Sequence, residues 1–149
     1  YGPGQQLCRL VPHAVFCAPN GQTFPLEGGG VAEKSFIDAT DLAVAVHLIM
    51  TEGGLGETYN AGTEAAVSIR HIVEVTATAA GFDFENFVTI APGRATEDTR
   101  YSLEGTKIHD ELDWRPQISL DTSVAAMVEW AKANLDALKL QTQRFSLRS

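Results

Sequence analysis

The sequence predicts an α/β fold of the α+β kind, with several helices and short sheets of two or three strands. Stretches with an apolar helical face take up most of the chain, and the strand-like stretches between them are short. These strands are too few to build a complete doubly wound sheet. The 149 residues are a one-domain length. We expect the domain to span residues 1–140 and a frayed tail to span 141–149.

The first element is an apolar helix within residues 5–18, which begins near Pro12 because proline is tolerated only in a first turn or at a kink. Pro19-Asn20-Gly21 ends this helix and supplies a turn. Residues 23–27 then form a short extended piece, and its proline confines that piece to the edge of a sheet.

A strand built on Phe36 and Ile37 follows the run Gly28-Gly29-Gly30 and turns directly into a helix. Thr40 is the predicted N-cap of this helix, which runs from Asp41 to Thr51. Its residues are apolar almost all round, so the helix needs cover on more than one side.

The remaining elements are shorter or follow clear caps. Ser68 caps a helix within 67–80 that Gly81 closes, and Ser119 or Asp121 caps the last helix. The buried stripe of that last helix is Val124, Met127, Val128, Ala131, Leu135 and Leu138. The other predicted elements are strands at 57–62 and 86–90, a polar loop at 92–98, an extended segment at 101–103 and a helix at 106–112 capped by Thr106.

Composition excludes several function classes. The net charge is −8 and no basic cluster exists, which argues against a nucleic-acid or anionic-membrane surface. No apolar run approaches the roughly 20 residues of a membrane helix, and no signal peptide is visible. Cys8 and Cys17 fall on opposite faces of the predicted first helix, so we expect two buried thiols, no disulfide and a reducing, cytoplasmic compartment.

The residues that usually carry catalysis are scattered. His13, His47, His71 and His109 each stand alone, so the sequence predicts no metal site. The triple glycine precedes a strand, which is the wrong context for a dinucleotide phosphate loop. Lys34 beside that flexible turn is a plausible phosphate contact, although a solvated lysine is the ordinary alternative.

Eight short motifs nevertheless occur in a fixed order. They are Tyr1-Gly2-Pro3, Leu10-Val11-Pro12, Phe24-Pro25-Leu26 with Gly28 and Gly30, Lys34-Ser35-Phe36-Ile37 through Asp41, Gly56-Glu57-Thr58-Tyr59-Asn60, Arg94 with Asp98, Glu111-Leu112-Asp113-Trp114-Arg115-Pro116, and Trp130 with Asn134. Together they resemble the C-terminal, substrate-binding portion of the extended short-chain dehydrogenase/reductases. The nearest resemblance is to NAD-dependent nucleotide-sugar 4,6-dehydratases and 4-epimerases, the dTDP-glucose 4,6-dehydratases and UDP-glucose 4-epimerases among them.

The resemblance implies a site for a nucleotide diphosphate sugar. Lys34 and Arg94 stand where the family has two arginines that hold the diphosphate. The base would lie near Pro25, Leu26 and Glu27, with Leu10 and Val11 facing it, and Asn60 would donate to phosphate or sugar. Three positions depart from the family pattern, which puts substrate affinity and identity in question: Lys34 for arginine, Asp38 for His or Tyr, and Glu97 for His.

The resemblance also implies an absent half. In the family, a Gly-x-x-Gly-x-x-Gly loop and a Tyr-x-x-x-Lys pair in an N-terminal Rossmann half hold NAD and perform the hydride chemistry, and neither motif occurs in residues 1–149. Tyr1 in place of a methionine likewise indicates a segment of a longer protein. We therefore expect no cofactor in this chain itself. We also expect an exposed apolar patch on the helix at 41–51, which would dock against an NAD-binding domain or form a homo-oligomer.

These observations leave three functions open. The first is the nucleotide-sugar-binding portion of an isomerase or lyase of carbohydrate metabolism, inactive without its other half. The second is a stand-alone module that binds a nucleotide or nucleotide sugar without turning it over. The third is a truncated domain that self-associates and has no ligand. Whether the chain is itself an enzyme is left open by the sequence.

Overall fold

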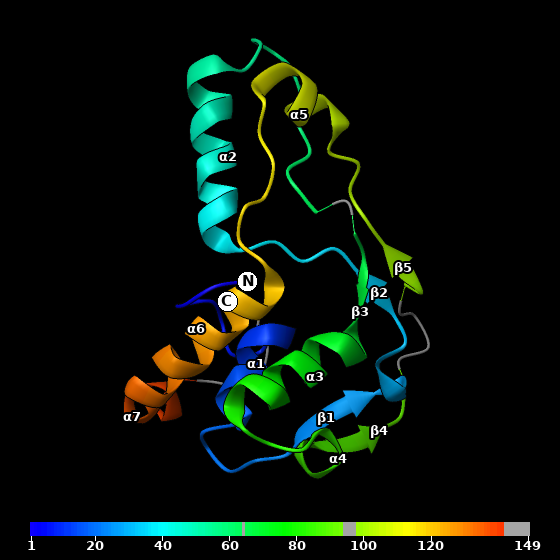
Figure 1. The fold of residues 1–149 in the computed structure, drawn as a ribbon, viewed down its shortest axis with the longest axis vertical. Helices are drawn as coiled ribbons and strands as arrows, with labels where there is room; N and C mark the ends of the chain where they lie inside the picture. The colour runs from blue at the N-terminus through cyan, green and yellow to red at the C-terminus, as the bar shows by residue number, and fades with distance from the viewer. Residues whose placement is uncertain (64, 94–97, 142–149) are drawn as a thin grey trace, which may run out of the picture.

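The computed structural model describes residues 1–63, 65–93 and 98–141. The α/β prediction is confirmed, because the described residues form seven α-helices and two short sheets (Figure 1). In chain order the elements are α1 Leu10–Cys17, β1 Phe24–Glu27, the 3₁₀ turn η1 Gly28–Gly30, β2 Glu33–Lys34, α2 Ala39–Glu52, β3 Val67–Ser68, α3 Ile69–Ala80, α4 Phe84–Phe87, β4 Val88–Ala91, β5 Arg100–Tyr101, α5 Thr106–Leu112, α6 Leu120–Ala133 and α7 Leu135–Lys139.

Both sheets are small and mostly made of parallel pairs. β1 pairs with β4 in parallel, with Phe24 opposite Val88. In the second sheet β2 is central, antiparallel to β3 and parallel to β5, and Lys34 lies opposite Val67 and Tyr101. Lys34 thus belongs to a strand that is paired on both sides.

The larger core lies between α1, α3 and α6, which Figure 1 shows packed together on one side of the β1–β4 sheet. Its fully buried side chains include Phe16, Ile72 and Val124. A neighbouring cluster joins Leu26 of β1 and Phe87 of α4 to α1 and α3. This core holds α1 and β1 side by side, which is the arrangement on which the candidate site depends.

A smaller unit, formed by α2 and α5, lies at the far end of the molecule (Figure 1). Its core is Ala45, Ile108 and Trp114. Tyr59 of the loop that follows α2 donates a hydrogen bond to the Glu111 carboxylate, with 2.7 Å between the oxygens. The prediction of a strand at 57–62 is wrong, because the segment is held by side chains to α5 and pairs with no described strand.

The segment that links β2 to α2 also differs from expectation. Asp38, rather than Thr40, caps α2 by accepting the Thr40 N–H at 2.7 Å, so the helix begins at Ala39. Phe36 and Ile37 lie outside the strand. The terminal amine of Tyr1 donates to the Ile37 carbonyl at 2.7 Å, and the Tyr1 ring packs edge-on against Phe36.

Two buried aspartates connect the α2–α5 unit to the larger core. Asp38 accepts a hydrogen bond from the Ser123 hydroxyl of α6. Asp41 accepts the N–H groups of Gln117 and Ile118 at 3.0 and 2.9 Å. These contacts join α2 to the segment in front of α6, more than seventy residues along the chain.

α2 carries the exposed apolar patch that the sequence predicts. Leu42, Val44, Val46 and Met50 are 40–79% exposed, and the buried residues of the helix are Asp41 and Ala45. Other described residues therefore pack against one side of α2 only. The sequence predicts packing on a second side as well, and no described residue supplies it. No described helix is long and apolar enough to cross a membrane.

Further predictions are corrected at the ends of elements. Asn86 and Phe87 belong to α4 rather than to a strand, so β4 begins at Val88. Thr106 is the first residue of α5, with Gly105 at the N-cap position, and the last predicted helix divides at Asn134 into α6 and α7. The predicted caps Ser68 and Ser119 are confirmed. The predicted tail lies outside the described residues from 142 onward.

The two cysteines are free thiols, as predicted, but only one of them is buried. Cys17 is 1% exposed in the core, and burial raises the pKa of its thiol to about 11. Cys8 is half-buried. It precedes α1, which begins at Leu10.

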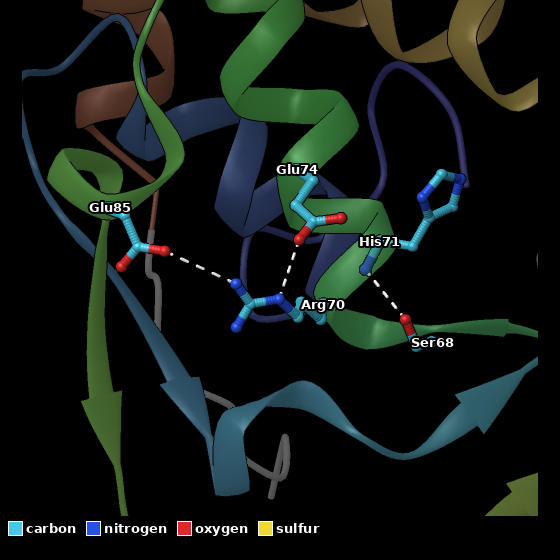
Figure 2. A network of polar contacts seen from close by, with 5 residues as sticks. All are labelled: Ser68, Arg70, His71, Glu74 and Glu85. Carbon is cyan, nitrogen blue, oxygen red and sulfur yellow. Dashed lines mark hydrogen bonds and ion pairs between the residues drawn. The ribbon is translucent and has the colours of Figure 1, made fainter.

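An exposed polar network fixes the start of α3 against α4 (Figure 2). Arg70 forms ion pairs with Glu74 at 2.8 Å and with Glu85 at 3.6 Å, and its guanidinium lies 4.4 Å from the centre of the Phe84 ring. Ser68 accepts the His71 N–H at 3.1 Å as the helix cap. Such exposed pairs add little stability each, but together they orient the helix whose first residue, Ile69, lines the candidate site.

Candidate functional site

A cavity of about 460 Å³ opens between α1, β1, β2 and the start of α3. Five residues predicted to contact a nucleotide sugar line it, although they come from three separate elements: Leu10, Val11, Pro25, Glu27 and Lys34. The three elements meet here because α1 and β1 share one core and β2 follows the glycine turn that leaves β1.

The first turn of α1 forms one wall of the cavity. Leu10 is half-buried, whereas Val11 is only 2% exposed and belongs mainly to the core. Pro12 lies in this first turn, where its missing N–H costs nothing. The N-cap residue Arg9 makes no side-chain cap, and the unpaired N–H groups and positive dipole of a first turn attract anions.

The opposite wall is β1, whose burial alternates along the strand. Pro25 is exposed and Glu27 half-buried, and both line the cavity. Leu26 points to the other face and is completely buried in the core. The structure therefore does not bring Leu26 to the cavity.

Arg94 and Glu97, the predicted second cation and its acidic neighbour, lie outside the described residues. The residue before Arg94 is described: Gly93 lies so close to Gly28 that a Cβ on either would come within 3.2 Å of the other's Cα. The described start of this loop thus reaches the glycine turn directly after Glu27. Asn60 is exposed and does not line the cavity.

Two basic residues of the cavity wall were not predicted. Arg9 and His13 lie four positions apart, so they stack on one face of α1, and the His13 N–H bonds to the Arg9 carbonyl at 2.9 Å. The i, i+4 spacing is visible in the sequence, but only the fold shows that this face borders β1. Arg9 and Lys34 bring two cations to the cavity, which Glu27 also lines, in a chain of net charge −8.

His13 is a titratable group of this wall whose pKa is shifted by its surroundings. Its ring lies edge-to-face against Phe24, with 5.4 Å between the ring centres. Burial lowers the pKa of His13 from its ordinary value of 6.5. No described group of three or more His, Cys, Asp or Glu side chains could hold a metal ion.

A second cavity, of about 510 Å³, lies between the two units of the fold. Its walls include Tyr1, Phe36, Trp114, Pro116 and Leu120. None of the predicted nucleotide-sugar contacts that the structure describes lines it. The first cavity therefore remains the candidate site.

Residues 1–127 match the family model described as GDP-mannose 4,6 dehydratase. The chain is 28% identical over 139 residues to the dTDP-D-glucose 4,6-dehydratase of Homo sapiens, covering 90% of this chain and 39% of the relative. It is 31% identical over 140 residues to the dTDP-glucose 4,6-dehydratase of Haemophilus influenzae, covering 87% and 41%. The chain thus spans about two fifths of the length of these relatives.

Solved structures agree with the sequence comparison. DesIV, a dTDP-glucose 4,6-dehydratase from Streptomyces venezuelae solved with NAD and TYD bound, matches with a TM-score of 0.85 and 31% identity over 92% of this chain and 42% of that one. The Bordetella bronchiseptica enzyme WbmF, solved with NAD⁺ and UDP, matches with a TM-score of 0.78 and 26% identity over 93% and 44%.

Proposed function

The chain belongs to the GDP-mannose 4,6-dehydratase family of extended short-chain dehydrogenase/reductases, and on that premise we propose that it is the nucleotide-sugar-binding portion of an NAD-dependent sugar dehydratase or epimerase. The observation that carries this proposal is the cavity between α1, β1 and β2. It gathers five residues that the family motifs assign to the nucleotide, together with the cation Arg9.

The charge pattern supports a diphosphate as the anchored group. A nucleotide diphosphate sugar carries two negative charges on its diphosphate, and a chain of net charge −8 must place cations locally to hold them. Lys34 and Arg9 line the cavity, and the first turn of α1 adds its dipole. Gly93, the last residue described before Arg94, lies against Gly28 of the turn that follows Glu27.

The apolar part of the wall suits the nucleotide base. Leu10 of α1 and Pro25 of β1 give the cavity apolar surface, and Phe24 also lines it. Glu27 at the end of β1 carries a carboxylate with two acceptor oxygens, a group that can accept a hydrogen bond from an amide or amino group of a base. The proposal therefore places the base between α1 and β1 and the diphosphate toward Lys34.

Binding of nucleotide sugars tests the proposal. Isothermal titration with UDP-, dTDP-, GDP- and CDP-sugars should give saturable binding of one or more of them. A hydrogen bond to a charged group contributes about 1.5–3 kcal/mol, so Lys34→Ala and Arg94→Ala should each weaken binding by about tenfold or more. Lys139→Ala is the matched control, because that lysine is exposed on α7 and lies outside the cavity.

The same titration separates the alternatives. Absence of binding at millimolar concentration, with no effect of Lys34→Ala or Arg94→Ala, would leave a self-associating domain without a ligand. Binding without turnover, even in the presence of a Rossmann half and NAD, would favour a stand-alone binding module.

The described glycine run differs from a dinucleotide phosphate loop. The glycine run forms a 3₁₀ turn that leads into β2, whereas a dinucleotide phosphate loop joins a strand to a helix. Two of the matched structures were solved with NAD bound over chains more than twice as long. We propose that a dinucleotide-binding half supplies the NAD site and packs against the exposed apolar face of α2.

A further inference from the structure

His13 lines the proposed nucleotide cavity but belongs to none of the motifs that predicted it. It lies one turn after Arg9 on α1, half-buried, with its ring edge-to-face against Phe24 of β1. An imidazole placed this way presents ring nitrogens that can donate to or accept from a ligand, and it is the side chain that gains a charge near neutral pH.

We propose that His13 is a direct contact of the nucleotide sugar and that protonation of its imidazole tightens binding as the pH falls. This inference rests on the proposed function, because the ligand is the same dianionic diphosphate sugar in the same cavity. It adds a third cation to Lys34 and Arg9 and makes the affinity depend on pH.

The other titratable and charged groups that line the cavity bear on the sign of this effect. The described ones are Arg9 and Cys8 beside α1, Glu27 on β1, Lys34 on β2 and the amine and phenol of Tyr1, while α3 contributes the apolar Ile69. Burial lowers the pKa of His13 in the free protein, so the imidazole is neutral at pH 7.5 to 8. A bound dianion favours the charged imidazole, so His13 takes up a proton when the ligand binds, and the affinity for the ligand rises as the pH falls below about 7.

The test measures the dissociation constant of a nucleotide sugar between about pH 5.5 and 8, a range in which carboxylates stay ionised and lysine ammonium groups stay protonated. Burial lowers the pKa of the Tyr1 amine from 8.0, so that amine also titrates there, but it donates to the Ile37 carbonyl and is the same in every variant compared. UDP-sugars serve as the probe, because a diphosphate esterified at both ends does not titrate there. The wild-type protein should bind about tenfold more tightly at the acid end, the size of one charge-assisted contact. His13→Gln should bind with an affinity that changes less than about twofold over the range.

Two further variants make the result decisive. His13→Phe keeps an aromatic ring against Phe24 without a titrating group, so it should give the same flat profile as His13→Gln even if the glutamine disturbs packing. His71→Gln removes an exposed imidazole outside the cavity and should keep the wild-type slope.

Two results would overturn the inference, and they are distinguishable. If UDP-sugars bind but wild type and His13→Gln share one pH profile, His13 is not a contact and the nucleotide site stands without it. If UDP-, dTDP-, GDP- and CDP-sugars fail to bind at every pH, the proposed function fails and this inference falls with it.

Discussion

Replacing Asp41 should loosen the α2–α5 unit from the rest of the protein. The Asp41 carboxylate is 5% exposed, and one of its oxygens accepts the N–H groups of both Gln117 and Ile118. Asp41 therefore holds the chain in front of α6 against the first turn of α2, at the point where the two units meet (Figure 1).

The magnitude follows from these two hydrogen bonds. Bonds to a charged acceptor contribute about 1.5–3 kcal/mol and neutral bonds about 0.5–1.5 kcal/mol. Asp41→Asn keeps the shape and one carbonyl acceptor, so it should lower the free energy of unfolding by about 1–2 kcal/mol. Asp41→Ala leaves both N–H groups without their acceptor and should cost roughly 2–4 kcal/mol.

Urea unfolding followed by tryptophan fluorescence measures this effect. Trp114 is buried in the α2–α5 unit, so a Trp130→Phe background reports that unit alone. Asp136→Asn on α7 removes the same charge from a fully exposed side chain and should change stability by less than about 0.5 kcal/mol. The reasoning is refuted if both Asp41 variants unfold within about 0.5 kcal/mol of the wild type.

Two further predictions concern the same region. Burial raises the pKa of Asp38, but hydrogen bonds from Ser123 and Thr40 and the nearby terminal amine outweigh burial and hold the pKa below its ordinary 3.8. The ionised Asp38 carboxylate therefore stabilises the fold above about pH 5, and this stabilisation is lost as the pH falls through 3.8 and below. Thermal melts from about pH 6 to 3 should therefore fall less steeply for Asp38→Asn, and parallel curves would contradict this. Light scattering should detect self-association that Val46→Asp with Met50→Asp abolishes, whereas a wild-type monomer at every concentration would count against the docking face.

Local signals in the sequence were sufficient for several elements. α3 begins after the N-cap Ser68 and ends before Gly81, as predicted. Both signals depend only on neighbouring residues: a side chain that caps the first turn, and a glycine that adopts the left-handed region. The start of α1 near Pro12 and the cap at Ser119 follow from equally local chemistry. The ordered family motifs likewise predicted that Leu10, Pro25 and Lys34 share one ligand, and all three side chains line the same cavity.

Predictions failed where distant contacts compete with local preference. Thr40 and Asp38 are both good N-cap residues. Asp38 is the cap of α2 in the structure: one of its oxygens accepts the Thr40 N–H, and the other accepts a hydrogen bond from Ser123 of α6. Phe36 and Ile37 favour a strand, but the N-terminal segment takes up the Ile37 carbonyl. Arg9 and His13 were overlooked for a related reason: the helix face that they share becomes a cavity wall only when β1 packs beside it.

By itself, the sequence determined the family, the class of fold, the main helices and five of the residues that line the cavity, since periodicity, caps and ordered motifs are properties of the chain. Tertiary structure alone decided that Leu26 faces the core, that Asn60 lies outside the cavity and that Arg9 and His13 join Lys34 around it. The physical reason is that charge and burial at a site depend on which elements meet there. That meeting is set by packing between residues far apart in the chain.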